Sequence, residues 1–141
     1  MKKNPFVMCF LLIILMSVPA CGSSANGIDA SLELTDADSG GRFTLRRGDT
    51  LRLSLRENGT TGYGWEFESR AESILVQVGE DYVLDGGHAV QDSVHVGGGG
   101  TRTYTFKALQ EGEDSLRLVY RRPWLRNEPP ADIFEAAISV E

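Results

Sequence analysis

The feature that most limits how this chain can fold is a repeated alternation of apolar and polar residues. Leucines occupy every second position within residues 50–56, and the same period of two recurs in residues 101–106 and 115–120. A period of two places the apolar side chains on one face of a β-strand, where they can be buried together. No stretch after residue 27 shows the 3.6-residue period of an amphipathic helix. The sequence therefore predicts an all-β chain.

Short strand candidates follow one another along the chain, separated by turn-forming residues. Residues 133–140 could also be drawn as a helix, but Ile138 and Val140 are β-branched and the apolar residues alternate, which favours a strand. About seven to eight short strands at this spacing predict a β-sandwich and not an α/β fold. The candidates are residues 30–34, 42–45, 50–56, 63–68, one extended stretch made up of 74–78 and 81–84, and residues 101–106, 115–120 and 133–140.

Residues 1–20 are predicted to be a signal peptide that is not part of the fold. Lys2 and Lys3 give this segment a positive start, and residues 6–16 form an apolar run that is too short to be read as a membrane span. The residues that lead up to Cys21 resemble a bacterial lipobox, in which the cysteine is lipidated after cleavage. The alternative is an ordinary signal peptide followed by an incidental cysteine.

The rest of the chain is predicted to be a lipid-anchored tether followed by one domain. Residues 21–27 contain the lipidated cysteine and a short polar tether, and residues 28–141 have the length of a single domain. Acyl chains at Cys21 would hold the protein on a membrane, since each buried CH₂ contributes about 0.8 kcal/mol. Gly22, where an Asp would retain such a lipoprotein in the inner membrane, favours the outer membrane. We therefore expect a lipid-anchored protein of the bacterial cell envelope, facing either the periplasm or the surface.

The charge of the chain argues against nucleic acid and anionic lipid as partners. Without Lys2 and Lys3, 12 of the 14 basic residues remain against 20 acidic ones, which is a formal charge of −8. A surface with this excess of negative charge is repelled by the phosphates of nucleic acid and by anionic headgroups. We therefore expect no nucleic-acid partner and no electrostatic attachment to the membrane.

The sequence gives little support for catalysis or for a metal site. Cys9 and Cys21 are the only cysteines, so the domain has no disulfide and no thiol nucleophile once the first is removed and the second is acylated. His88 and His95 are the only histidines, and they lack partners at the spacing of a zinc site. The aspartates of residues 81–92 do not form a calcium-loop pattern. We therefore expect no enzyme activity, no cofactor and no metal.

Three loops stand out by their composition, and the first of them lies between the strands predicted at residues 50–56 and 63–68. This first loop presents two adjacent threonines framed by glycines, and its residues are Asn58, Gly59, Thr60, Thr61 and Gly62. Threonine carries its hydroxyl and methyl on a short stem, so the tip can pack closely on another surface. Glycine can adopt the positive φ angles that a tight turn often needs. The simpler interpretation is a turn without a function, which describes most loops.

The second loop, here called the glycine loop, contains four glycines in a row: Gly97, Gly98, Gly99 and Gly100. Four glycines inside a strand would be costly, since glycine loses the most backbone entropy on ordering. We therefore expect a loop whose backbone lies against a partner. A flexible linker is a weaker alternative, because the run leads directly into the strand predicted at residues 101–106. A phosphate-binding loop would need a following helix with a lysine, and neither is present.

The third loop follows the strand predicted at residues 115–120 and contains Arg122, Pro123 and Trp124. Pro123 ends the preceding strand because its ring fixes φ and removes a backbone donor. Trp124 lies on a polar, proline-containing loop, and an exposed tryptophan beside arginine is typical of an interface hot spot. A buried tryptophan is the alternative.

Taken together, the three loops resemble those of the chagasin-type inhibitors of papain-like cysteine peptidases. The matching motifs are Asn-x-Thr-Thr-Gly-Tyr-x-Trp beginning at Asn58, Gly-x-Gly-Gly before a strand with an aromatic residue, and Tyr-x-Arg-Pro-Trp beginning at Tyr120. The resemblance covers nearly the whole predicted domain. It implies an immunoglobulin-like β-sandwich whose three loops lie at one end and form a wedge. In the family, the wedge enters the active-site cleft of the peptidase and blocks it without being cleaved.

The resemblance also implies a role for each loop. Thr60 and Thr61 are expected on the loop that reaches the catalytic centre, and the glycine loop is expected to lie along the cleft with its backbone. The third loop is expected to pack on the other side of the cleft. The expected partner is therefore a papain-like cysteine peptidase, bound by a monomer of this chain.

The first loop departs from the family pattern, which usually has proline after the asparagine, whereas this chain has Gly59. Proline would order the tip in advance, so Gly59 is expected to make it more mobile and to weaken inhibition by about 0.4–1 kcal/mol. Bulky residues at Gly99 and Gly100 are expected to block close backbone approach while leaving the fold intact.

Two other functions are compatible with a sandwich, because this fold serves many functions. One is a structural or adhesive immunoglobulin-like lipoprotein of the envelope, which would require none of the three loop motifs. The other is a lipoprotein that assists envelope assembly, which would expose an apolar edge strand or groove that the sequence does not show.

Overall fold

The computed structural model describes residues 30–85 and 98–141. The predicted signal peptide, the lipidation site at Cys21 and the tether lie outside the described residues, as do Gly97 and both histidines. Within the described ranges, no helix is both long enough and apolar enough to cross a membrane.

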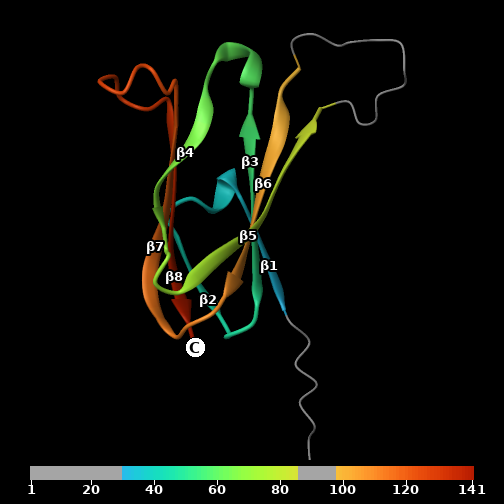
Figure 1. Cartoon of the computed structure of the whole chain (residues 1–141), viewed down its shortest axis with the longest axis vertical. Coiled ribbons are helices and arrows are strands. Elements are labelled where there is room, and N and C mark those ends of the chain that lie inside the picture. Colours follow the sequence, from blue (N-terminus) through green and yellow to red (C-terminus); the bar gives the residue numbers. More distant parts are fainter. Residues whose placement is uncertain (1–29, 86–97) are drawn as a thin grey trace, which may run out of the picture.

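The described chain is an all-β sandwich of two four-stranded sheets, as the sequence predicted (Figure 1). One sheet has the strand order β1-β3-β6-β5 and the other has the order β2-β8-β7-β4. Two short 3₁₀ turns, η1 (Asp36–Asp38) and η2 (Gly59–Thr61), are the only helical elements in the described residues. The strands are β1 (Ser31–Thr35), β2 (Gly41–Leu45), β3 (Thr50–Glu57), β4 (Gly64–Arg70), β5 (Leu75–Leu84), β6 (Gly100–Ala108), β7 (Gly112–Arg121) and β8 (Asp132–Val140).

The alternating leucines of β3 form the centre of the core, as the period of two predicted. Leu51, Leu53 and Leu55 are fully buried, whereas Arg52 and Arg56 between them are exposed. Each such leucine contributes about 1.5–3 kcal/mol by leaving water. The opposite sheet supplies the facing side chains from alternate positions of its inner strands, namely Leu116, Leu118, Phe134, Ala136, Ile138 and Val140. The strand prediction for residues 133–140 is confirmed, because β8 buries every second residue.

The extended stretch predicted from residues 74–78 and 81–84 is one long strand, β5. A β-bulge between Gln77 and Gly79 accommodates one extra residue, so the alternation is interrupted without ending the strand. This interruption explains why the alternation is not continuous between the two parts of the predicted stretch.

The expectation that no apolar edge strand is exposed is wrong. β5 lies at the edge of its sheet, and Val76, Val78, Val83 and Leu84 are exposed on it. The bulge and two acidic residues in the middle of the strand are the features that usually prevent such an edge from pairing with another chain.

The strand connections bring three loops to one end of the sandwich (Figure 1). The first loop links β3 in one sheet to β4 in the other, the glycine loop leads into β6, and the third loop links β7 to β8. The ladders fix this arrangement, because Glu57 at the end of β3 pairs with Gly100 and Gly64 at the start of β4 pairs with Arg121. The sheet registers therefore hold the bases of all three loops next to one another.

Candidate functional site

The first loop is a single 3₁₀ turn that its own side chains hold closed. The Asn58 side-chain carbonyl accepts hydrogen bonds from the Thr60 amide at 3.2 Å and from Thr60 Oγ1 at 2.7 Å. The Thr61 hydroxyl donates to the Asn58 main-chain carbonyl at 2.7 Å. These bonds follow from the preference of asparagine for capping positions. The tip is therefore ordered by Asn58 and the two threonines even though Gly59 stands where proline would restrict the chain.

Gly62 and Trp124 join the first loop to the third loop. Gly62 ends the 3₁₀ turn with φ 77°, a left-handed conformation that glycine adopts without strain. A Cβ atom at this position would lie 2.6 Å from Cη2 of Trp124, so the indole rests directly on the glycine backbone. Trp124 nevertheless keeps 68% of its surface exposed. The tryptophan is thus positioned by the first loop but remains free to contact a partner, and the alternative of a buried core residue is wrong.

Arg122 makes a second connection between the same two loops. Its Nε donates a hydrogen bond to the Thr61 carbonyl at 3.2 Å. Its guanidinium also lies over the ring of Tyr63, 4.7 Å from the ring centroid, at a distance suited to a cation–π interaction. Arg122 therefore supports the tip of the first loop from the side of the third loop.

An aromatic cluster supports both loops from below. The ring of Tyr120 lies 5.5 Å from that of Tyr63 and 5.1 Å from that of Trp65. Its hydroxyl accepts a hydrogen bond from the Asn58 amide at 2.9 Å, and Trp65 Nε1 donates to the Arg56 carbonyl at 2.9 Å. The sequence analysis used Tyr120 only as part of a motif and missed this supporting role. Its position at the end of a strand, directly before Arg121 and Arg122, was the available signal.

The glycine loop is shorter than the sequence predicted. Gly98 and Gly99 are loop residues, but Gly100 is the first residue of β6 and is buried. A Cβ atom at Gly100 would lie 2.6 Å from both the Tyr82 ring and the Val83 carbonyl oxygen. Glycine is required here by close strand packing, and Gly100 belongs to β6 and not to the loop.

Of the two loop residues Gly98 and Gly99, Gly98 has more free space around the position of an added Cβ atom. A Cβ atom at Gly98 meets only the Asp85 carbonyl oxygen, at 3.9 Å, whereas one at Gly99 would lie 3.4 Å from both Asp85 Oδ2 and the Glu57 carbonyl oxygen. The expectation that bulky residues at Gly99 and Gly100 leave the fold intact is therefore wrong for Gly100.

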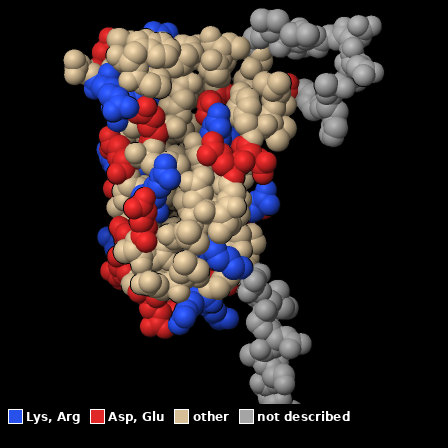
Figure 2. Space-filling view, viewed as in Figure 1, with Lys and Arg blue, Asp and Glu red and all other residues tan. Residues whose placement is uncertain are grey.

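The loop end differs in charge from the sides of the sandwich (Figure 2). Uncharged residues gather over the loop end, whereas acidic and basic side chains alternate below it. Among the ion pairs of the sandwich, Arg117 binds Glu68 at 2.8 Å and Glu135 at 2.6 Å. The hydrogen bond from Arg117 lowers the pKa of Glu68. These ion pairs lie away from the three loops, on strands β4, β7 and β8.

The loops carry groups that can bind a partner. The loops present threonine hydroxyls, glycine backbone, one guanidinium and one indole. Within residues 30–85 and 98–141, no three His, Cys, Asp or Glu side chains are grouped as a metal site would require. His88 and His95, the histidines considered above, are not among these residues.

Replacing Gly59 with proline is expected to stabilise the protein. Gly59 is the first residue of η2, a position that suits the fixed φ of proline, and an added Cβ there meets nothing within 4 Å. Asn58 has φ −119° and ψ 90°, close to the extended region that a residue before proline prefers. Gly59→Pro should raise the free energy of unfolding in urea by about 0.4–1 kcal/mol, because the unfolded chain becomes less flexible. Gly59→Ala is the matched control with a smaller gain, and a loss of stability in the proline variant would contradict the geometry.

A comparison with models of known protein families finds a match to most of the sandwich. The model of the chagasin family peptidase inhibitor I42 matches residues 44–138. Amoebiasin-1 of Entamoeba histolytica is 33% identical over 97 residues, which are 68% of this chain and 87% of that protein. Chagasin of Trypanosoma cruzi is 28% identical over 94 residues, which are 67% of this chain and 84% of that protein.

Solved structures show the same fold. A cysteine protease inhibitor from Entamoeba histolytica superposes with a TM-score of 0.69 at 21% identity, over 79% of this chain and 96% of that one. The solution structure of amebosin superposes with a TM-score of 0.58 at 32% identity, over 79% of this chain and 98% of that one. The immunoglobulin-like sandwich expected from the loop motifs is thus confirmed.

Proposed function

Because the chain belongs to the chagasin family of peptidase inhibitors, we propose that it inhibits papain-like cysteine peptidases by inserting its three loops into the active-site cleft. Family membership favours this function over a structural or adhesive role, which needs none of the loop motifs. The relatives with this fold are named as inhibitors and not as enzymes, and inhibition without catalysis is what we propose for this chain.

The observation that carries the proposal is the way Trp124 is held. The indole is 68% exposed, yet its edge rests on Gly62 and its loop is bound to the first loop through Arg122. An exposed aromatic side chain that is already positioned loses little conformational entropy when it binds. The first loop beside it carries the small residues Thr60 and Thr61, and the glycine loop carries Gly98, so the loop end combines one large side chain with small ones, as a cleft would require.

The same geometry explains why the inhibitor should resist cleavage. The first loop is closed by hydrogen bonds among Asn58, Thr60 and Thr61, so its backbone is a 3₁₀ turn. A peptidase cleaves a segment that lies extended across its catalytic residues. A tip held as a turn occupies the cleft without presenting an extended peptide bond, so the complex persists.

The site is complete within one chain, since all three loops arise from a single sandwich. We therefore propose that a monomer is the inhibiting species. We also propose that the protein is held on the envelope of a bacterium by acylation of Cys21, as the lipobox resemblance indicates, with the outer membrane as its location. Loss of the full chain from the membrane fraction in a Cys21→Ser variant would support this anchoring, and retention would contradict it.

A titration of papain with the chain from Ser23 onward tests the inhibitory function. The expected result is a loss of peptidase activity in proportion to added inhibitor, with the inhibitor still intact on a gel afterwards. No inhibition at micromolar concentrations by a domain that is folded by circular dichroism would contradict the proposal. Rapid cleavage of the first loop would contradict the proposed mode of binding.

A further inference from the structure

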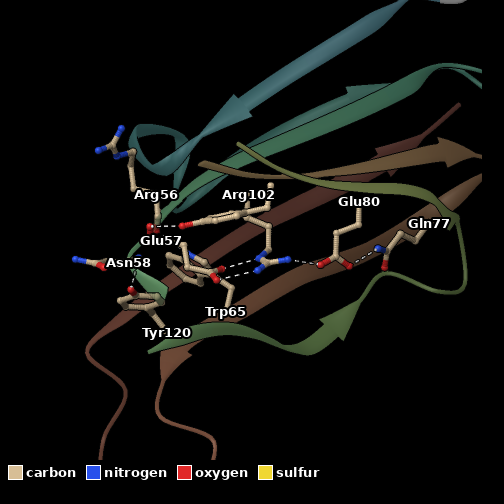
Figure 3. A network of polar contacts seen from close by, with 9 residues as sticks. Arg56, Glu57, Asn58, Trp65, Gln77, Glu80, Arg102 and Tyr120 are labelled. Atoms are coloured by element: carbon tan, nitrogen blue, oxygen red, sulfur yellow. Dashed lines mark hydrogen bonds and ion pairs between the residues drawn. The ribbon is translucent and has the colours of Figure 1, made fainter. Parts of the chain in front are cut away.

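An ion pair between Glu57 and Arg102, largely shielded from water, joins the end of β3 to the start of β6 (Figure 3). The Glu57 carboxylate accepts hydrogen bonds from Arg102 Nε at 2.6 Å and from Arg102 Nη2 at 2.9 Å. The Glu57 side chain is 7% exposed and that of Arg102 is 26% exposed. The hydrogen bond to Glu57 raises the pKa of Arg102, so the guanidinium stays charged. Glu57 is the last residue of β3 before the first loop, and Arg102 lies two residues after the start of β6.

The pair extends to the edge strand of the same sheet. Arg102 Nη1 donates to Glu80 Oε1 at 2.6 Å, and the guanidinium lies 5.1 Å from the ring centroid of Tyr82. The Tyr82 hydroxyl in turn donates to the main-chain carbonyl of Glu57 at 3.4 Å. One arginine therefore ties together the ends of β3, β5 and β6, the strands that carry the first loop and the glycine loop.

A second ion pair joins the same strands on the other face of the sheet. Arg56 precedes Glu57 in the strand, so its side chain points the opposite way. It binds Asp85 through Nη1 at 3.0 Å and Nη2 at 2.5 Å. The Asp85 amide donates to the Gly99 carbonyl at 2.8 Å. The base of the glycine loop is thus held to the base of the first loop by one ion pair on each face.

The backbone ladder between β3 and β6 ends where Glu57 pairs with Gly100, directly at the bases of these two loops. A groove of about 540 Å³ lies beside these bases and extends to the other sheet, lined by residues that include Arg56, Glu57, Gly99, Trp65 and Tyr120. Beyond this last ladder pair, the position of one loop relative to the other depends on the ion pairs and hydrogen bonds described above.

We propose that Glu57 and Arg102 are positioning residues that set the spacing between the first loop and the glycine loop, so that both fit one cleft at the same time. The proposal rests on the proposed inhibitory function, because spacing matters only where the two loops bind together. Neither residue is expected to contact the peptidase, since Glu57 is buried and Arg102 is largely covered.

Replacing the ion pair is expected to weaken inhibition while leaving the stability of the protein nearly unchanged. Replacing a buried ion pair with apolar residues of similar volume is often neutral or stabilising, because the desolvation of two charges offsets their attraction. Apolar residues cannot reproduce the directional bonds from one arginine to two carboxylates. The Glu57→Leu/Arg102→Met variant should therefore keep its fold and lose the fixed spacing of the loops.

The test compares this double variant and the milder Glu57→Gln variant with the unaltered full chain in mild detergent. We expect the double variant to change the thermal midpoint by less than about 4 °C. We expect the inhibition constant for papain to rise about tenfold, and the Asp85 amide, which bonds to Gly99, to exchange with solvent about tenfold faster. Glu57→Gln should show both effects more weakly. Glu135→Gln, which removes a 2.6 Å ion pair from the other sheet, is the matched control and should change neither quantity.

Unchanged inhibition and unchanged Asp85 exchange in the double variant would overturn the proposal. If the thermal midpoint of the double variant falls together with its inhibition, the isosteric Glu57→Gln variant decides. A raised inhibition constant with an unaltered midpoint in Glu57→Gln supports the positioning role, and an unchanged inhibition constant overturns it. If even the unaltered chain fails to inhibit papain, the proposed function fails, and the exchange measurement still reports whether the pair controls the glycine loop.

Discussion

Truncating Trp124 to alanine is expected to weaken peptidase inhibition more than any other single side-chain deletion in the three loops. The indole is the largest exposed side chain at the loop end and is held in place by Gly62. Aromatic residues that are positioned before binding are typical hot spots, and their truncation costs about 2 kcal/mol or more, roughly a 30-fold rise in the inhibition constant. The free energy of unfolding should change little, because most of the indole is in water in the free protein. Steady-state inhibition and urea unfolding measure the two quantities.

The matched control for Trp124→Ala is Leu109→Ala. Leu109 is also an exposed apolar residue, about half exposed, but it lies in the β6–β7 turn at the opposite end of the sandwich. Its truncation should leave inhibition unchanged. An inhibition constant that is the same for Trp124→Ala and the unaltered protein would remove the third loop from the binding site.

A bulky side chain at Gly98 is expected to abolish inhibition without unfolding the protein. An added Cβ at this position meets only one atom, at 3.9 Å, so leucine fits the free sandwich. In the complex, the same side chain would stand between the loop backbone and the wall of the cleft. We expect at least a hundredfold loss of inhibition, equivalent to about 2.7 kcal/mol, because a steric clash excludes the docked position. Inhibition assays on Gly98→Leu, with circular dichroism as the check of folding, measure this effect.

Gly100→Ala provides the contrast that separates binding from folding. Its Cβ would lie 2.6 Å from the Val83 carbonyl oxygen, and backbone atoms cannot move aside cheaply. We expect a loss of about 1–3 kcal/mol in the free energy of unfolding. If Gly98→Leu inhibited as well as the unaltered protein, the glycine loop would not lie close to the peptidase.

The strands could be predicted from the sequence because burial of one strand face requires apolar and polar residues to alternate. The leucines of β3 and the alternating residues of β8 are examples, and both strands lie within a residue or two of the predicted limits. The first and third loops could be predicted equally well from the sequence, since asparagine, glycine and proline favour turns through local interactions. Trp124 was correctly expected to be exposed because its neighbours are polar.

The residues that tie the loops together could not be predicted, because their partners are distant in sequence. Glu57 and Arg102 meet only through the register between β3 and β6, and nothing near either residue indicates the pairing. Gly100 was misassigned for the same reason: four consecutive glycines carry no signal for which one is enclosed by Tyr82 and Val83. Contacts between strands, and not local preference, decide these positions.

The most direct test of the central claim is whether the bound protein shields the catalytic thiol of the peptidase. Papain would be mixed with increasing amounts of the inhibitor and treated with iodoacetamide, and the alkylated fraction of its active-site cysteine would be measured by mass spectrometry. Occupation of the cleft by the three loops predicts that alkylation stops once the two proteins are equimolar, and that Trp124→Ala requires a much larger excess for the same shielding. Alkylation at an undiminished rate in a saturated complex would contradict the account, because the loops would then bind outside the active-site cleft.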